Sequence, residues 1–293
     1  RNAALLVIVC TLVWSFPNGS SADTVIGADF VVSEDTVWTK EGSPYLVQGG
    51  IIVDNDSTLS VKPGTVVQFN SGGVLHVLGR LLAEGTADEP IVFSSSAGSW
   101  GGIQFFNEAS SSSLDNVVVR DAHAISDFSS KDLSISNTKV EDGNYGIVAY
   151  GSRLFLDNFS AENISGDAID ISYGSDATLA NITLKNVGAG VEVYVDSKAD
   201  ISNLAVDFSQ NEAISVYVGS NARVASSTIT NVSNSYGAVE VFDDSSADIS
   251  NMILQGTSGD GIEVFDNGSL TIRDSVISGF REDGRCGGQV KSV

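Results

Sequence analysis

Two chemical types of side chain recur along this sequence at intervals of about 22 residues. Carboxylates and small polar residues form one column, and aromatic residues form a second column two positions later in each repeat. The clearest stretch holds Glu192, Tyr194, Tyr217, Glu240, Phe242, Glu263 and Phe265. Carboxylates bind calcium or sugar hydroxyls and aromatic rings pack on sugars, so these seven are candidate ligand-binding residues.

Glu240 and Glu263 stand at equivalent positions of consecutive repeats. If the repeats stack as parallel strands, the two side chains lie about 4.8 Å apart, and like charges facing each other destabilise a sheet. A bound cation would relieve the repulsion, so we name this pair as candidate calcium ligands. The alternative is a purely structural role, in which the stacked aromatic rings cover the sheet and the carboxylates keep its surface hydrated.

Paired carboxylates could also perform acid–base chemistry on a glycan, but an acidic column produces such pairs by chance. No Lys or Arg occupies either column to serve as the base of a lyase. His76 and His123 are 47 positions apart, without a metal-like spacing. We therefore assign no catalytic residue from the sequence.

A repeated phrase must position these columns. It reads small residue, branched aliphatic, variable residue, apolar residue, and its aliphatics are Ile103, Ile125, Ile147, Ile169, Val191, Ile214, Val239 and Ile262. A fixed period of this length marks a repeat architecture. Within a repeat, Val191 and Val193 alternate with Glu192 and Tyr194, which is the period of a strand. The sequence predicts an all-β solenoid with three short strands per coil of about 22 residues and no room for helices.

A second recurring phrase is aliphatic-x-Asn. We expect its asparagines to lie inside the solenoid and to bond their equivalents above and below as a ladder. Two of them, Asn158 and Asn181, begin glycosylation triplets. An asparagine inside the solenoid could not carry a glycan, so we prefer the ladder for these two residues. The predicted ladder residues are Asn116, Asn137, Asn158, Asn181, Asn203 and Asn251.

The ends of the chain have different compositions. Residues 1–22 have the charged start, apolar run and small residues of a signal peptide. We expect residues 23–45 to cap the solenoid, residues 46–280 to form it, and residues 281–293 to be an irregular, truncated end. The formal net charge of −22 argues against nucleic-acid binding. Only Cys286 would remain after cleavage of the leader, so no internal disulfide can form.

Three segments of the early repeats, at residues 58–67, 79–86 and 90–94, resemble the right-handed parallel β-helix proteins, and residues 100–105 then open the regular coils. Pectate lyases and many secreted or surface-displayed bacterial proteins share that fold. The resemblance implies a location at the cell exterior. We expect a non-catalytic monomer with a binding or scaffolding role, and a polysaccharide or another surface component as partner. The alternative is a polysaccharide lyase or epimerase acting on acidic glycans.

Overall fold

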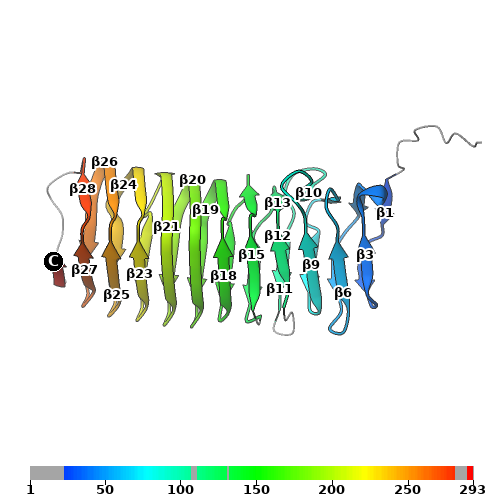
Figure 1. Ribbon diagram of the computed structural model, residues 1–293, viewed down its shortest axis with the longest axis horizontal. Helices are drawn as coiled ribbons and strands as arrows, with labels where there is room; N and C mark the ends of the chain where they lie inside the picture. Colours follow the sequence, from blue (N-terminus) through cyan, green and yellow to red (C-terminus); the bar gives the residue numbers. More distant parts are fainter. Residues whose placement is uncertain (1–22, 107–110, 131, 281–288, 293) are drawn as a thin grey trace, which may run out of the picture.

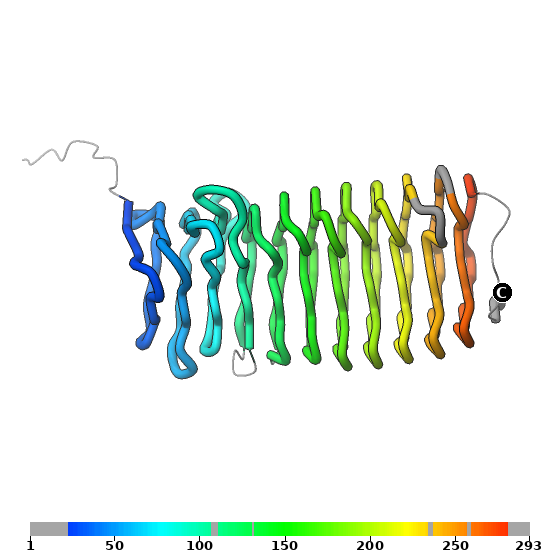
Figure 2. Tube along the Cα trace, turned by 180° about the vertical axis from the view of Figure 1, so that it is seen from behind, coloured from blue at the N-terminus to red at the C-terminus, as the bar shows by residue number. Residues whose placement is uncertain are grey.

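Parallel strands stacked along one axis make up nearly the whole molecule (Figures 1 and 2). The computed structural model describes residues 23–106, 111–130, 132–280 and 289–292. This part of the chain contains no α-helix and one 3₁₀ turn, η1 (Lys40–Gly42). Each coil contributes a strand to three sheets, and several long strands bend through a corner and belong to two of them. The predicted all-β solenoid with three strands per coil is therefore confirmed.

The three sheets are named here A, B and C. Sheet A contains β2 (Phe30–Val32), β5 (Ile51–Val53), β8 (Val74–Val77), β11 (Gly102–Phe105), β14 (Ile125–Phe128), β17 (Ile147–Tyr150), the ends of β19 (Ser160–Ser172) and β20 (Asp176–Tyr194), β22 (Ile214–Tyr217), and the ends of β24 (Thr228–Val241) and β26 (Ile253–Val264). Sheet B contains β3 (Thr36–Trp38), β6 (Thr58–Val61), β9 (Arg80–Glu84), β12 (Ser113–Asp115), β15 (Leu133–Ser136), β18 (Arg153–Asp157), the starts of β20 and β21 (Lys198–Ser209), β23 (Asn221–Ala225), β25 (Ser246–Ser250), β27 (Ser269–Arg273) and β29 (Gln289–Ser292). Sheet C contains β1 (Thr24–Ile26), β4 (Tyr45–Val47), β7 (Val66–Phe69), β10 (Ile91–Ser95), β13 (Val117–Arg120), β16 (Lys139–Glu141), β28 (Val276–Ser278) and the remaining parts of the long strands.

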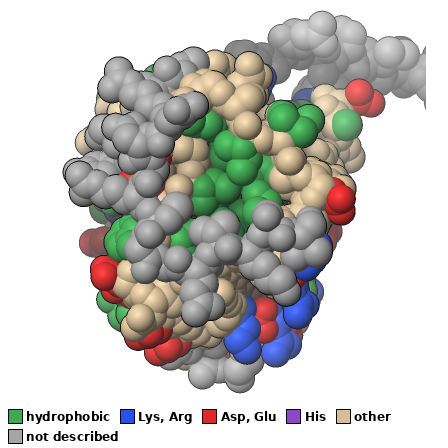
Figure 3. Space-filling view, turned by 90° about the vertical axis from the view of Figure 1, so that its left-hand side faces the viewer, with side chains coloured by type: hydrophobic (Ala, Val, Ile, Leu, Met, Phe, Trp, Pro, Cys, Tyr) green, Lys and Arg blue, Asp and Glu red, His purple; other side chains and the backbone are tan. Residues whose placement is uncertain are grey.

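The aliphatic phrase builds the core as predicted. Each of its eight aliphatics pairs with the next one in exact register, from Ile103 opposite Ile125 to Val239 opposite Ile262. All are buried except Ile262, which is partly buried in the last coil. Seen along the axis, hydrophobic side chains occupy the centre and polar ones the rim (Figure 3). Each coil therefore adds one layer of side chains to the hydrophobic core.

Close contact between neighbouring coils explains why a small residue precedes each aliphatic of the phrase. A Cβ at Gly190 would lie 2.1 Å from the carbonyl oxygen of Ala213 in the next coil, and one at Gly146 would lie 2.2 Å from that of Ala168. Real side chains do not approach a backbone oxygen so closely. These two coils therefore allow only Gly at this corner, whereas Ala168 and Ala213 occupy the same position in the coils that follow them.

The six predicted ladder asparagines occupy the corner between sheets B and C. All six adopt the left-handed backbone conformation, with φ between 47° and 57°, which Asn tolerates better than most residues. Asn158 donates to Asn137 and Asn203 to Asn181, whereas Asn181 donates to Asp157 of the preceding coil. The expected interior position is wrong, because these side chains are exposed and only that of Asn116 is half-buried. Backbone conformation, rather than burial, explains why asparagine recurs here.

Serines at the corner between sheets A and B form a relay inside the solenoid. The backbone N–H of Ser152 donates to the hydroxyl of Ser175 at 3.0 Å, that of Ser175 to Ser197 at 3.2 Å, and that of Ser197 to Ser220 at 3.1 Å. All of these serines are buried. Each buried corner N–H thus finds an acceptor in the following coil, as buried polar groups require.

Both ends of the solenoid differ from the expected organisation. The predicted cap at residues 23–45 is a full coil instead, since β1, β2 and β3 pair in parallel with β4, β5 and β6. Trp38 and Tyr45 belong to its core and stack with ring centroids 4.6 Å apart. The end is not wholly irregular, because β29 extends sheet B beside β27. The predicted signal peptide lies outside the described residues.

One carboxyl group lies inside the core. Asp127 occupies an inward position of β14 between Phe105 and Ala149, and its side chain is 0% exposed. Its Oδ1 accepts the backbone N–H of Ser130 at 3.0 Å, whereas its Oδ2 and the Ser130 hydroxyl have no partner. Burial raises the pKa of the Asp127 carboxyl above its ordinary value.

Replacing Asp127 with Asn should stabilise the protein at neutral pH. A raised folded-state pKa means that ionisation of Asp127 opposes folding as the pH rises above its unfolded value, and Asn cannot ionise. Its amide can also donate to the unpartnered Ser130 hydroxyl. We expect a gain of about 1 kcal/mol in unfolding free energy at pH 7, vanishing near pH 3.5, by urea denaturation. The exposed Asp56→Asn serves as control, and an Asp127→Asn variant less stable than wild type at pH 7 would contradict this account.

Candidate functional site

The outward side of sheet A carries the acidic column predicted from the sequence. The register places Asp170 opposite Glu192, Glu192 opposite Ser215, and Glu240 opposite Glu263. A third outward column precedes it, at the position before the small residue, and contains Asp167, Glu212 and Asp260. We call these seven carboxylates the acidic stripe: Asp167, Asp170, Glu192, Glu212, Glu240, Asp260 and Glu263.

Several carboxylates of the acidic stripe are largely buried, although they lie on the outward side of sheet A. Asp170, Glu240 and Glu263 are only 9%, 8% and 7% exposed. The preceding corner lies on one side of them and the aromatic column on the other, so neighbouring side chains cover them. These acids therefore do not lie on an open face.

Three of these carboxylates converge. Asp167, Asp170 and Glu192 each place an oxygen within 4.8 Å of the other two, and we call them the carboxylate trio. The Tyr217 hydroxyl donates to Oε1 of Glu192 from the following coil. Oδ1 of Asp170 is buried and has no hydrogen-bond partner. An oxygen-only donor set with one orphaned atom suits a hard cation.

Burial and mutual repulsion change the acidity of the trio. Burial, with the nearby Asp167 carboxylate, raises the pKa of Asp170 to about 6. The pKa values of Asp167 and Glu192 are also raised, mainly by burial, and the two side chains hydrogen-bond each other. Near neutral pH the trio therefore holds protons that a divalent cation would displace.

Farther along the stripe, Glu240 and Glu263 face each other as predicted for the candidate calcium pair. The backbone N–H of Gly237 donates to Oε1 of Glu240 at 3.1 Å. Burial, followed by the charges of Glu212 and Glu263, raises the pKa of Glu240 to about 7. Calcium binding by this pair stays a prediction, and the trio, whose third member lies at the corner, is the more complete donor set.

The aromatic column is continuous, although the residue opposite Tyr150 and Tyr194 in the coil between them is Ser172. Tyr173 takes that place: its ring centroid lies 4.1 Å from that of Tyr150 and 5.8 Å from that of Tyr194. Ser172 is buried and donates to the carbonyl oxygen of Ala149. Tyr173 adopts a left-handed conformation with φ of 56°, and the equivalent corner residues Val195 and Val218 do the same, with φ of 53° and 55°. This conformation therefore belongs to the repeated corner.

Most rings of this column cover one another. Tyr194, Tyr217, Phe242 and Phe265 stack with centroids 4.6–5.1 Å apart and planes within 9° of parallel, so their faces are occupied by neighbours. This arrangement favours the shielding role for four of the seven candidate binding residues. Tyr150 and Tyr173 are the accessible pair, at 41% and 46% exposure, beside the coil that carries Asp170.

Sequence reasoning missed two members of this site. Asp167 stands one position before the small residue, and the same 22-residue spacing extended to that column would have found it. Tyr173 follows Ser172 by one residue, and no periodic pattern could have placed it. Asp170 was seen in the acidic column but was not chosen as a ligand.

Two stretches of the chain match known families. Residues 189–285 match the right handed beta helix region, and residues 31–151 match the pectate-lyase like beta helix domain. No curated protein matches the chain. The stacked coils and both matches agree with the resemblance noted in the sequence.

Two solved structures are similar in outline. An alginate lyase from Paenibacillus sp. str. FPU-7 has 14% identity and a TM-score of 0.40, over 78% of this chain and 92% of that one. The catalytic domain of a GH87 alpha-1,3-glucanase in complex with nigerose has 10% identity and a TM-score of 0.38, over 92% of this chain and 63% of that one. Neither likeness says what this chain binds. Among the described residues, no helix has the length and apolarity needed to span a membrane.

The raised pKa values predict a stability that falls with pH. Asp170 and Glu240 have folded-state pKa values of about 6 and about 7, above their ordinary 3.8 and 4.5. Folding is therefore most favoured below pH 4 for these groups, and that contribution is lost as the pH rises through 6 and 7. In chelator, the unfolding free energy should drop by about 2 kcal/mol between pH 5 and pH 8. Asp170→Asn should flatten the profile, and a profile that rises over this range would refute the assignment.

Proposed function

We propose that this chain, which belongs to the right-handed parallel β-helix proteins, is a non-catalytic binding protein that holds a calcium ion in the carboxylate trio and a polysaccharide beside it. The observation that carries the proposal is the trio itself: three converging, largely buried carboxylates with an orphaned oxygen on Asp170. The ion would coordinate oxygens of the glycan, and the protein would act at the cell exterior as a monomer.

The donor set supports calcium in particular. Calcium takes six to eight oxygen ligands and accepts carboxylates in one- or two-oxygen modes. Asp167, Asp170 and Glu192 supply up to six oxygens, and glycan hydroxyls or water complete the shell. Burial, and after it the charge of the neighbouring carboxylates, raises the pKa values of Asp170 and Glu192, and a positive ion would stabilise their charged forms. Extracellular calcium is abundant enough for weak sites, which fits an exterior location.

The exposed tyrosines support a sugar as the ligand next to the ion. Tyr150 and Tyr173 stack on each other and leave 41% and 46% of their surfaces accessible. Rings of this kind combine an apolar face with a polar hydroxyl and suit the faces of pyranoses. The net charge of −22 repels polyanions, so an acidic glycan would need the cation as a bridge.

A second candidate function is catalysis on acidic glycans, as a lyase or epimerase. It is favoured by the hydrogen bond between Asp167 and Glu192 and by the pKa of Glu192, which is raised to about 7, because a group with a pKa near neutrality can act as a general acid or base. The described outward positions of sheet A carry no Lys or Arg, so a base on this sheet would be a carboxylate, a tyrosine or His76.

Calorimetry with calcium tests the binding proposal. We expect one calcium ion per chain at pH 7.5, and at least tenfold weaker binding for Asp170→Asn, because a central carboxylate ligand is lost. Glu240→Gln is the matched control, since it removes a carboxylate of the same stripe outside the trio. Binding lost in Glu240→Gln but kept in Asp170→Asn would move the ion to Glu240 and Glu263. The absence of heat at millimolar calcium would defeat both assignments.

Ultraviolet absorbance of unsaturated uronates separates the two functions. Incubation of the protein with polygalacturonate or alginate, with and without calcium, should give no increase in absorbance. Product formation that disappears in Glu192→Gln would establish catalysis and overturn the non-catalytic proposal. Glu263→Gln controls for a general effect of removing negative charge.

A further inference from the structure

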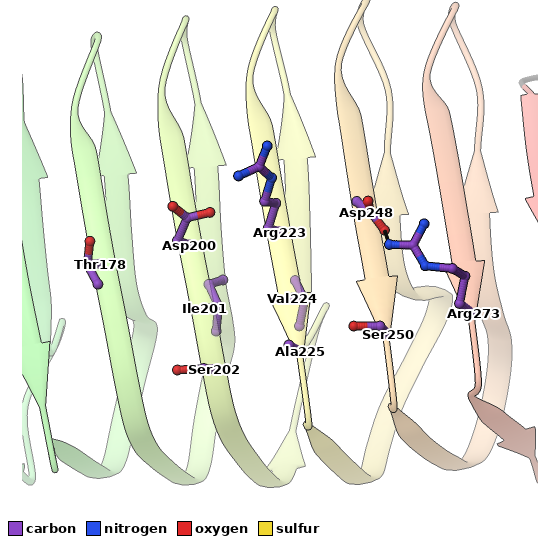
Figure 4. A pocket seen from close by; sticks show the side chains of 10 residues that line it. All are labelled: Thr178, Asp200, Ile201, Ser202, Arg223, Val224, Ala225, Asp248, Ser250 and Arg273. Carbon is purple, nitrogen blue, oxygen red and sulfur yellow. Dashed lines mark hydrogen bonds and ion pairs between the residues drawn. The ribbon is translucent and has the colours of Figure 1, made fainter.

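A second surface with binding chemistry lies on the outer side of sheet B, over the strands from β20 to β27 (Figure 4). Two hollows, of about 320 Å³ and about 640 Å³, share the wall formed by Asp200, Arg223 and Asp248. These three residues stand directly opposite one another on consecutive strands. This surface belongs to a different sheet from the acidic stripe.

The shared wall alternates in charge. Arg273 reaches back to Asp248, with Nη2 2.7 Å from its Oδ1, whereas Arg223 has no carboxylate partner among the described residues (Figure 4). Including Lys198 and Asp176, which line the larger hollow, three cations face three carboxylates. A locally balanced surface on a chain of net charge −22 is a departure from the rest of the molecule.

Small side chains form the floor of the smaller hollow. Ser202, Ala225 and Ser250 occupy equivalent outward positions of three consecutive coils, and all are half-buried. The Ala225 methyl group lies between the two hydroxyls, and Arg273 follows Ser250 at the next coil. The floor is therefore flat, with an apolar centre and hydroxyls on either side.

We propose that the smaller hollow, beside Arg223, is a binding site for neutral sugar units of a glycan that lies across the coils. A carboxylate accepts hydrogen bonds from sugar hydroxyls and a guanidinium donates to them, so the order Asp200, Arg223, Asp248 offers acceptor, donor, acceptor to neighbouring hydroxyls. The Ala225 methyl can contact the C–H face of the ring. The smaller hollow falls in the size range of ordinary ligand sites.

The carboxylates at this surface disfavour the binding of an acidic glycan. A uronate placed beside Arg223 would also lie beside Asp200 and Asp248, whose backbones are each about 4.8 Å from that of Arg223. A neutral hydroxyl can satisfy all three groups without that repulsion. The site goes beyond the calcium-dependent function proposed for sheet A and does not depend on it.

Titration of the whole protein with neutral hexasaccharides, followed by NMR in excess chelator, tests this site. The probes are cellohexaose, laminarihexaose and maltohexaose, and chelator removes any contribution of calcium on sheet A. We expect at least one hexaose to bind, with about tenfold weaker binding for Arg223→Ala, because two or more hydrogen bonds to a charged group are lost. Arg223→Lys should restore binding only in part, and Ala225→Trp should abolish it by filling the floor.

Arg153→Ala is the matched control, since Arg153 lies on the same sheet outside both hollows and is exposed. It should bind like the wild type. The proposal is overturned if none of the hexaoses binds, or if Arg223→Ala and Ala225→Trp, folded as judged by circular dichroism, bind as well as Arg153→Ala. Binding that is lost in Asp170→Asn and kept in Arg223→Ala would place the sugar on sheet A and would also overturn it.

Discussion

In-register stacking of parallel coils is the constraint on which the rest of this molecule depends. Each residue meets its equivalent about 4.8 Å away in the next coil, so the repeat multiplies whatever chemistry one position carries. For aliphatics such as Ile147 and Ile169 the result is a continuous core, and for the corner serines it is a hydrogen-bonded relay. For carboxylates the same geometry concentrates negative charge, which costs free energy unless protons or a cation neutralise it.

Carboxyl groups with raised pKa values lie at three places in the fold. Asp127 lies inside the core, Glu240 faces Glu263, and Asp170 lies with Asp167 and Glu192 at the edge of sheet A; burial is the first cause of the raised pKa in all three regions. Only the trio combines convergence of three carboxylates, an orphaned oxygen and an accessible aromatic pair next to it. Stability alone gives no reason to retain such a group. A ligand that binds the folded state would offset the cost by mass action.

The period and the alternation of strands made the coil, the core column and the aromatic column predictable, because each depends only on residues that repeat. Departures from the repeat were not predictable in the same way. Tyr173 enters the aromatic column from the corner, one residue after the position that carries the ring in the other coils. The first coil was mistaken for a cap because each of its strands is only three residues long. Asp127 follows Ile125 by two positions, so the alternation placed it inward, but a carboxylate there contradicts the usual rule for core residues. The surface position of the asparagines could not be read from the phrase, since a left-handed corner and an interior ladder favour the same residue.

The two outer surfaces of the solenoid differ in charge, and this difference gives them different ligand chemistry: carboxylates alone on sheet A, and a balanced row of acids and bases on sheet B. The central claim concerns sheet A, and a crystal structure grown with calcium, with anomalous diffraction data, tests it most directly. The account predicts an anomalous peak between the side chains of Asp167, Asp170 and Glu192, with oxygen ligands at calcium distances. Crystals from the same conditions with no peak at the trio, or with a peak only between Glu240 and Glu263, would contradict it.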